Sequence, residues 1–364
     1  MARRKQKTVR VGLCIFLSVV LLTVGVLGGA LFFLKKITPA SDPLPSGDLS
    51  IHFIELGNAY TGDCTYIKAG DTDILIDAGS RTSSVPTISA YLNNFVTDGK
   101  LEYVIVTHAH QDHYAGFATG VNADSIFDLY ECETIIDFAL TNQKPDSTMY
   151  SNYIRERDDE IANGATHYTA ADCIAQNKDV FDLGAGIELK ILDSYYYTNK
   201  TSDENDYSVC CLISQGNNHY LFTGDLEESG EEHLVEMNAL PEVVLYKAGH
   251  HGSKTSSSNA LLEVVKPKTV CVCCCAGSAE YTDTKDNQFP TQAFIDRISP
   301  YTDAVYVTTL CVNWEEKTFT SMNGNIIVSS SGGALTVTCS VSDTKLKDTA
   351  WFKNNRTTPD AWVA

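Results

Sequence analysis

The chain has 364 residues, of which 43% are hydrophobic and 20% charged, a composition typical of a globular protein. Its formal net charge is −19, and residues 1–36 hold seven of the 27 Lys and Arg side chains but no Asp or Glu, so the remainder carries 20 basic and 46 acidic side chains, or −26. Such a charge excludes a broadly basic surface for nucleic acid, and any contact with a polyanion has to be local or assisted by a metal ion.

The first predicted element is a membrane span. Residues 11–34 carry no charged side chain and exceed the roughly 20 residues that cross a bilayer. Five basic side chains precede the run and two follow it, which predicts a cytoplasmic N-terminus (1–10) and an extracytoplasmic remainder. A cleaved signal peptide is the alternative, but its apolar core is shorter, about 7–15 residues. We therefore expect a single-pass protein of the cell membrane, with residues 35–48 as a linker rich in Pro and Ser.

Beyond the linker, predicted strands alternate with predicted helices. Strands are expected at 51–56, 64–68, 73–76, 103–106, 134–138, 187–192, 207–214, 220–223, 243–246, 269–275 and 304–308, and a final set at 318–322, 325–329 and 334–339. Helices are expected at 85–95, 149–163, 229–237, 257–265 and 291–298. Many strands with several helices predict sheets covered by helices. We expect one domain over 49–340, followed by a tail over 341–364.

Twelve cysteines raise the question of disulfides or a thiolate metal site. Eleven lie outside the predicted span, and an odd number does not fit a complete disulfide framework. The segment VCVCCC (270–275) lacks the C-x₂-C spacing of metal knuckles, and its neighbouring residues would face opposite sides of a strand. We therefore interpret these cysteines as small apolar residues of a buried strand.

Four candidate metal ligands follow a short apolar strand. His108, His110, Asp112 and His113 occupy six positions, and imidazole nitrogen and carboxylate oxygen are the usual ligands of Zn²⁺ and similar ions besides thiolate. Four ligands so close in sequence do not easily reach one tetrahedral centre. They suit two neighbouring ions, one held by His108 and His110 and the other by Asp112 and His113.

This His-x-His-x-Asp-His motif is the signature of the metallo-β-lactamase superfamily, which the chain also resembles at ILIDAG (74–79), FTGD (222–225) and KAGHHGS (247–253). The resemblance implies the α/β fold class, an αβ/βα sandwich with the metals at one edge. It implies that Asp77 supports the metal-site loop and that Asp225 bridges two metals. It also implies His250 or His251 as a ligand of the second metal, of which we assign His250 to the metal and His251 to catalysis.

Longer segments resemble the hydrolase domain of the competence protein ComEC, which is thought to act as a nuclease on one DNA strand. They lie at 53–79, 104–116, 204–213, 220–228, 246–258 and 322–333. The resemblance therefore covers most of the chain after the linker and does not include the multi-span channel of that protein. It implies a bacterial protein with a role related to competence.

Two positions depart from the superfamily pattern. Most two-metal relatives have a histidine in the third motif, where this chain has Asn205, Asp206, Tyr207 and Ser208. The first metal then keeps His108 and His110, with Asp225 as a bridge, and Asn205 and Ser208 become supporting residues. A His-Pro motif near the end appears as Phe289-Pro290. The metal stays open between Zn²⁺ and Mn²⁺, with one or two ions.

A hydrolytic mechanism follows from this ligand set. A metal ion lowers the pKa of bound water, and the hydroxide attacks phosphorus or a carbonyl carbon. Asp112 is a candidate ligand and proton acceptor, while Lys247, His251 and Lys254 would offset charge on substrate oxygens, unless Lys254 is only a solvated loop residue. Asp63 is a weaker site candidate.

Basic side chains near the metals on an acidic body favour an anionic ester as substrate. We therefore expect a membrane-anchored, extracytoplasmic phosphodiesterase or nuclease, with DNA as one candidate substrate and no stable protein partner besides the membrane. The alternatives are an amide or lactone hydrolase of the same fold, or a wall-associated binding module.

Overall fold

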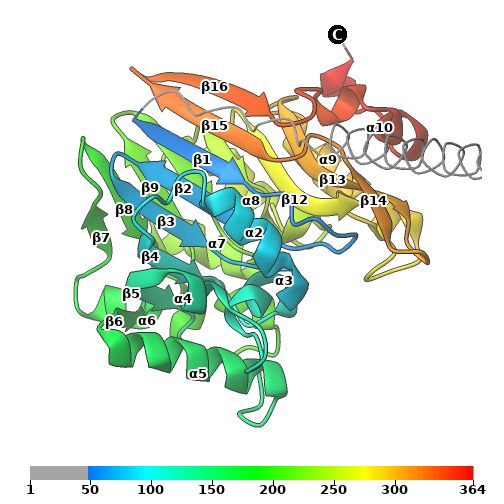
Figure 1. Cartoon of the computed structure of the whole chain (residues 1–364). Coiled ribbons are helices and arrows are strands. Elements are labelled where there is room, and N and C mark those ends of the chain that lie inside the picture. Colours follow the sequence, from blue (N-terminus) through cyan, green and yellow to red (C-terminus); the bar gives the residue numbers. More distant parts are fainter. Residues whose placement is uncertain (1–47, 364) are drawn as a thin grey trace, which may run out of the picture. The chain divides into compact units, whose positions relative to one another are not determined.

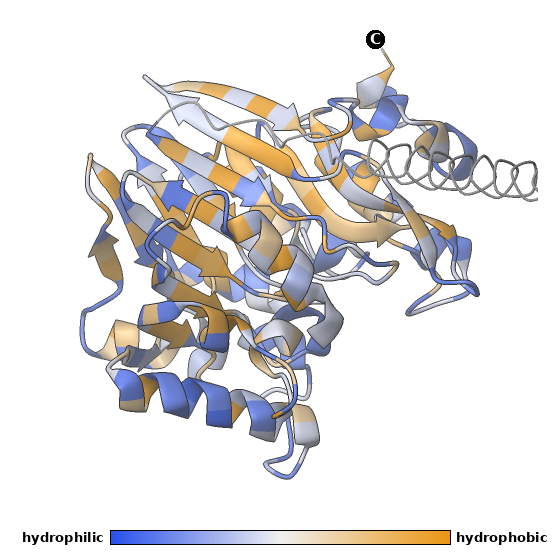
Figure 2. Ribbon diagram, in the orientation of Figure 1, coloured by the Kyte–Doolittle hydropathy of each residue, from blue (hydrophilic) through white to orange (hydrophobic). Residues whose placement is uncertain are grey.

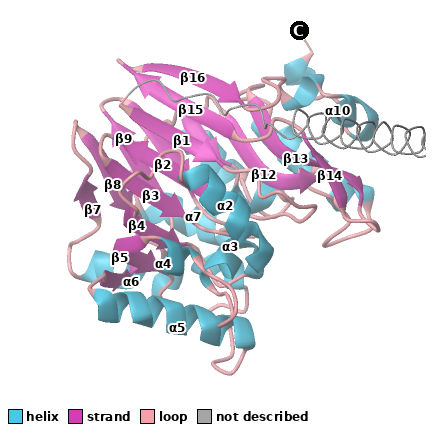
Figure 3. Ribbon diagram, in the orientation of Figure 1, coloured by secondary structure: helices cyan, strands magenta, loops and turns pink. Residues whose placement is uncertain are grey.

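Two sheets of eight strands lie face to face at the centre of the fold (Figures 1 and 3). The computed structural model describes residues 48–363. The first sheet has the order β16 (Ala334–Cys339), β15 (Ile326–Ser331), β1 (Leu49–Phe53), β2 (Thr65–Ala69), β3 (Thr72–Ile76), β4 (Lys100–Val106), β5 (Glu131–Asp137), β6 (Thr166–Thr169). The second has the order β14 (Thr318–Ser321), β13 (Val305–Asn313), β12 (Val270–Ala276), β11 (Leu245–Lys247), β10 (Asn218–Phe222), β9 (Cys211–Gln215), β8 (Ile187–Ile191), β7 (Val180–Asp182).

Helices cover the outer faces of both sheets. The first sheet packs against α2 (Val85–Leu92), α4 (Ile126–Leu129), α5 (Thr148–Asn163) and α6 (Ala170–Ala175). The second packs against α7 (Glu228–Met237), α8 (Asn259–Val265), α9 (Gln292–Ile298) and α10 (Ala350–Asn355). The predicted αβ/βα sandwich is therefore confirmed.

The membrane part of the predicted fold class was wrong. Within residues 48–363, no helix is long and apolar enough to cross a bilayer. The longest of these helices, α5, has 16 residues and is mostly hydrophilic (Figure 2). The expected span 11–34 lies outside the described residues, as do the N-terminus 1–10 and almost all of the linker. We therefore correct the fold class to the sandwich alone and withdraw the location in the cell membrane.

The cysteine-rich strand β12 follows the alternation of a buried strand. Cys271 and Cys273 belong to the cluster between the sheets, whereas Cys274 belongs to the cluster under α7, α8 and α9. Each of the eleven cysteines among residues 48–363 is free. Burial raises the pKa of Cys271 and Cys273 well above the ordinary thiol value, so both stay protonated and pack as small apolar side chains.

Residues 341–363, where we expected a tail, continue the folded unit. Leu346, Phe352 and Trp362 are buried in the cluster beneath the second sheet. The Trp362 indole N–H donates to the carbonyl of Thr302 at 2.9 Å. The apolar side chains of this segment therefore complete the core on that side.

Local capping and short edge strands explain where elements differ from the predicted ranges. The strand expected at 207–214 begins only at Cys211, because Glu204–Tyr207 form a 3₁₀ helix whose N-cap, Asp203, accepts a hydrogen bond from the Asn205 N–H. The helix expected at 257–265 begins at Asn259, because the Ser258 hydroxyl caps it. Strands β6 and β7 have only four and three residues and leave little alternation to detect.

A buried histidine in β1 predicts acid sensitivity of the fold. The His52 ring is fully buried and pairs with the Tyr91 hydroxyl at 2.7 Å and the Ser50 hydroxyl at 2.9 Å, both neutral partners. Burial lowers the pKa of His52 to about 3. The unfolded chain binds this proton below about pH 6.5, so stability is lost as pH falls from 6.5 toward 3.

Between pH 7 and pH 4.5, the unfolding free energy of the parent chain should decrease. In the His52→Gln variant we expect this decrease to be smaller by about 2–3 kcal/mol. Urea unfolding at the two pH values measures the difference. The same change at His233, whose side chain is 34% exposed, controls for the loss of one histidine. Equal acid losses in all three proteins would contradict the assignment.

Candidate metal centre

The candidate ligands come from loops that follow strands in both sheets. Asp77 follows β3, the His-x-His-x-Asp-His segment follows β4, Asp225 follows β10, and His250 and His251 follow β11. Strands β3 and β4 are parallel, as are β10 and β11, so the carboxyl ends of each pair lie at the same edge. The fold therefore places at one edge residues that lie up to 174 positions apart, from Asp77 to His251.

Two glycines allow the loop after β3 to contact the loop after β4. A Cβ atom on Gly79 would lie 1.6 Å from the Asp112 carbonyl oxygen, and one on Gly116 would lie 2.4 Å from the Ala78 carbonyl oxygen. Backbone hydrogen bonds join the loops there, from the Ala78 N–H to the His113 carbonyl at 2.8 Å and from the Gly116 N–H to the Ala78 carbonyl at 2.7 Å. The histidine-containing loop is thus held against the first motif by close backbone approach.

Asp77 supports this loop and orients one histidine. Its carboxylate accepts hydrogen bonds from the Thr107 N–H at 2.8 Å and the Thr107 hydroxyl at 2.7 Å, and it lies 2.7 Å from His113 Nδ1. Nδ1–H donates to Asp77, which leaves His113 Nε2 facing the centre. Such a carboxylate–histidine pair is the usual way to fix the tautomer of a metal-binding histidine.

Four buried side chains converge at the centre: Asp63, His113, Asp225 and His251. One ligand atom from each lies within 4.8 Å of the others. His113 Nε2 and His251 Nε2 lie 3.3 Å apart, and Asp225 Oδ2 lies 3.0 and 3.1 Å from them. Ligands 2.0–2.1 Å from a tetrahedral ion are separated by about 3.3 Å, so these three atoms have the spacing that a single ion requires.

Asp112 lies next to this group. Its Oδ2 lies 3.3 Å from His251 Nε2 and accepts a hydrogen bond from the Tyr281 hydroxyl at 2.5 Å. His251 Nδ1–H donates to the Cys273 carbonyl at 2.8 Å, which turns His251 Nε2 toward the carboxylates. The structure therefore brings His251, rather than the neighbouring His250, into the buried group.

The charges of the centre fit a divalent cation. Burial lowers the pKa of His113, but Asp225 and Asp77 outweigh this effect and raise it to about 10, so the site attracts positive charge. Burial raises the pKa of Asp63, and Lys247 and His251 outweigh it and keep that carboxyl ionised. One oxygen of Asp63 and one of Asp225 are buried and accept no hydrogen bond. Carboxylates with open acceptor positions beside two imidazole nitrogens are a suitable donor set for Zn²⁺ or Mn²⁺.

A second pair of histidines lies beside this group. His108 Nε2 and His110 Nδ1 are 3.0 Å apart, and the rings of His108 and His113 are 4.2 Å apart. In place of a third-motif histidine, the Ser208 hydroxyl lies 3.4 Å from His108 Nδ1 and accepts a hydrogen bond from the Asp225 N–H at 3.0 Å. The pair therefore offers two nitrogen ligands, whereas the buried group offers two nitrogens and several carboxylate oxygens.

His250 and Asn205 are linked through one carboxylate. His250 Nε2 lies 4.0 Å from Asp225 Oδ2, while its Nδ1 lies 3.1 Å from Glu227 Oε1. The Asn205 side-chain amide donates to the same Glu227 oxygen at 3.3 Å. His250 therefore stands at the wall of the centre, and Asn205 supports it indirectly.

The structure separates the two lysines that the sequence suggested for catalysis. Lys247 is buried, and its Nζ contacts the Asp63 carboxylate, lies 3.5 Å from Asp225 Oδ1 and donates to the Gly224 carbonyl at 3.2 Å. Lys254 is exposed, and its carbonyl accepts a hydrogen bond from Arg297. Lys247 thus offsets the negative charge of the buried carboxylates of Asp63 and Asp225, and Lys254 does not line the pocket.

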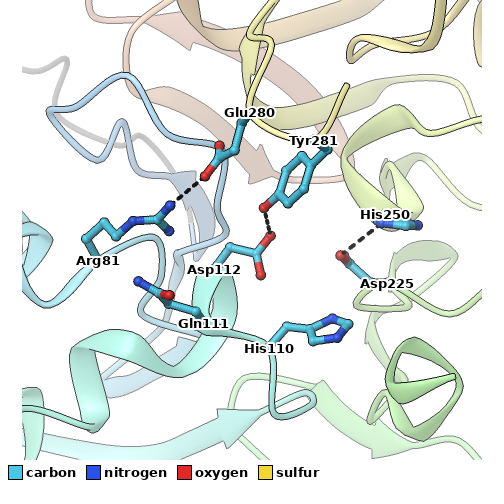
Figure 4. A pocket seen from close by; sticks show the side chains of 8 residues that line it. All are labelled: Arg81, His110, Gln111, Asp112, Asp225, His250, Glu280 and Tyr281. Atoms are coloured by element: carbon cyan, nitrogen blue, oxygen red, sulfur yellow. Dashed lines mark hydrogen bonds and ion pairs between the residues drawn. The ribbon is translucent and has the colours of Figure 1, made fainter. Parts of the chain in front are cut away.

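An open pocket of about 510 Å³ gives access to the centre (Figure 4). Its lining residues are Arg81, His110, Gln111, Asp112, Asp225, His250, Glu280 and Tyr281. Sequence reasoning missed Arg81, Glu280 and Tyr281. Arg81 stands two residues after the ILIDAG motif, a position that could have drawn attention to it, whereas Glu280 and Tyr281 lie in the loop after β12 and carry no motif.

Known proteins resemble parts of this chain. Residues 57–126 match the metallo-beta-lactamase superfamily. The chain is 30% identical over 120 residues to "Recombination protein 2" of Haemophilus influenzae, covering 33% of this chain and 14% of that protein. It is 24% identical over 252 residues to "Competence protein ComA" of Neisseria gonorrhoeae, covering 67% and 29%. It therefore spans less than a third of the length of either relative.

Solved structures match the chain at low identity and with low TM-scores. The metallo-beta-lactamase fold protein YhfI from Bacillus subtilis is 11% identical with a TM-score of 0.40, covering 72% of this chain and 96% of that one. A long form RNase Z from yeast is 12% identical with a TM-score of 0.38, covering 62% and 37%.

The sandwich, the match of residues 57–126 and the buried Asp/His group support a resemblance to the metallo-β-lactamase superfamily, with side chains that could hold a divalent metal ion. Within that superfamily, the chain resembles the competence proteins of the ComEC type, as its sequence segments indicated.

Proposed function

We propose that the protein is a metal-dependent phosphodiesterase and, more specifically, a nuclease. The observation that carries this proposal is the position of Arg81. Among the described residues that line this pocket, it is the one Lys or Arg, and it stands across the pocket from Asp225 and His250 (Figure 4). A guanidinium in this place matches the geometry and charge of a phosphodiester better than those of an amide or lactone.

The residues of the centre have separate roles in this proposal. A divalent ion held by His113, His251 and Asp225 would supply Lewis acidity and lower the pKa of a water molecule. Asp112 lies at the pocket and accepts the proton, while Tyr281 holds its carboxylate in place. Arg81 binds a non-bridging phosphoryl oxygen and orients the ester.

Two further observations support a polynucleotide as the natural substrate. The pocket is open, which suits a substrate that extends beyond it. The relatives named for competence and recombination favour DNA.

Hydrolysis of bis-p-nitrophenyl phosphate and of nitrocefin separates the proposal from its alternative, an amide or lactone hydrolase of the same fold. We expect turnover of the phosphodiester with added Mn²⁺ or Zn²⁺, its loss in EDTA, and a large decrease in the His110→Ala variant. Turnover of nitrocefin alone would favour the alternative. Absence of both activities, together with no metal in elemental analysis of the purified chain, would exclude both enzymes.

A further inference from the structure

Beside the pocket, three side chains from two other loops gather around Tyr60. The Arg81 guanidinium lies 4.0 Å from the centre of the Tyr60 ring, and the Trp314 ring meets that ring edge-on at 5.6 Å. Lys317 Nζ lies 2.9 Å from the Trp314 ring centre and 5.7 Å from the Tyr60 ring centre. We call Tyr60, Arg81, Trp314 and Lys317 the Tyr60 strip.

The strip is continuous with the pocket through Arg81. The Arg81 side chain donates to Glu280 Oε1 at 2.7 Å and to the Ser80 carbonyl at 2.8 Å, which fixes the guanidinium at the pocket wall. In this ion pair Arg81 is 27% exposed and Glu280 only 7%, so the cation is the partner that meets the solvent. Glu280 also accepts a hydrogen bond from the Thr61 N–H at 2.8 Å, which ties the loop of Tyr60 to the same wall.

The outer part of the strip comes from the turn between β13 and β14. Trp314 and Tyr60 are partly exposed, and Lys317 is exposed. The same turn carries the exposed residues Glu315 and Glu316, so it is not a uniformly basic surface. The turn therefore presents an aromatic ring beside charges of both signs.

We propose that the Tyr60 strip binds a single-stranded polynucleotide segment adjacent to the phosphodiester in the pocket. Arg81 would bind a phosphate at the pocket wall, while unpaired bases would stack on the aromatic rings and Lys317 would meet the next phosphate. Aromatic platforms with interleaved cations are how proteins hold single strands without sequence preference. A duplex does not fit this surface equally well, because its paired bases offer no free faces. This inference rests on the proposed function and names the strand that the same site accepts.

Binding of a fluorescein-labelled 12-nucleotide single-stranded DNA in EDTA, followed by fluorescence anisotropy, tests the strip without hydrolysis. We expect Trp314→Ala and Arg81→Gln each to weaken binding about tenfold. The matched controls are Tyr195→Ala, an exposed aromatic stacked on His233, and Arg155→Gln, an arginine paired with Glu156 in another part of the surface. Both controls should bind as the parent chain does, and circular dichroism confirms that all four variants are folded.

A second readout uses the metal-loaded enzyme. For Trp314→Ala, kcat/KM for a single-stranded oligonucleotide should fall about tenfold more than kcat/KM for bis-p-nitrophenyl phosphate, which carries no stacking bases. Three results would contradict the proposed role of the Tyr60 strip. They are equal losses on both substrates, duplex binding as tight as single-strand binding, and no loss of DNA binding in either strip variant. If the chain bound single-stranded DNA through Trp314 but hydrolysed no phosphodiester, the binding role of the Tyr60 strip would be supported and the proposed function would be contradicted.

Discussion

The His251→Ala variant is expected to lose the divalent ion that the parent chain retains after dialysis. His251 Nε2 lies 3.1 Å from Asp225 Oδ2, 3.3 Å from His113 Nε2 and 3.3 Å from Asp112 Oδ2. It is therefore close to three other candidate ligand atoms. Outer partners alone change metal affinity by 10–100-fold, so removal of a direct ligand should lower affinity by about 100-fold or more. Elemental analysis after dialysis against Mn²⁺ or Zn²⁺ measures the loss, and hydrolysis of bis-p-nitrophenyl phosphate should fall with it.

The neighbouring histidine provides a matched control. His250 lies at the pocket wall with its Nδ1 against Glu227, and its Nε2 is 4.0 Å from the nearest Asp225 oxygen. The His250→Ala variant should therefore keep the ion while its hydrolysis decreases. If instead His250→Ala lost the ion and His251→Ala kept it, the two roles would be reversed, as the motif alone had allowed.

The second large effect concerns stability. Lys247→Met is expected to lower the unfolding free energy of the metal-free protein by about 3–5 kcal/mol, because it removes the lysine that contacts the buried, charged Asp63 and leaves only histidines beside it. The Lys247 and Asp63 side chains are only 3% and 4% exposed, so solvent screens this pair little. Lys254→Met, at an exposed position, should change stability by less than about 0.5 kcal/mol. Urea unfolding in EDTA measures both.

A double variant separates charge from packing. Adding Asp63→Asn to Lys247→Met removes the uncompensated carboxylate, so part of the lost stability should return. A Lys247→Met variant that is no less stable than Lys254→Met would show that Lys247 does not compensate the carboxylates. If Lys247→Met were destabilising and the double variant recovered nothing, the cost would lie in packing rather than in charge.

Much of the fold could be predicted, because the alternation along β8, the continuous apolar run of β12 and the turns between strands are local properties of the sequence. The ligands that follow β4 could be predicted for the same reason, since four of them lie within six residues. Capping at Asp203 and Ser258 moved the ends of elements, and the edge strands β6 and β7 were too short to leave a pattern. The membrane span fell on residues 11–34, outside the part of the chain that the structure describes.

Local periodicity in the sequence predicted sheets covered by helices, and the dense ligand motif indicated the residue types of the metal centre. The αβ/βα sandwich was implied by the resemblance of that motif to the metallo-β-lactamase superfamily. Which of the two adjacent histidines joins the buried group was visible only in the folded structure, where His251 Nε2 lies 3.1 Å from Asp225 Oδ2 and His250 Nδ1 lies 3.1 Å from Glu227 Oε1. The folded structure also separated Lys247 from Lys254 and brought Arg81 to the pocket. Each of these outcomes depends on contacts between loops far apart in the chain, and such contacts leave no local pattern in the sequence.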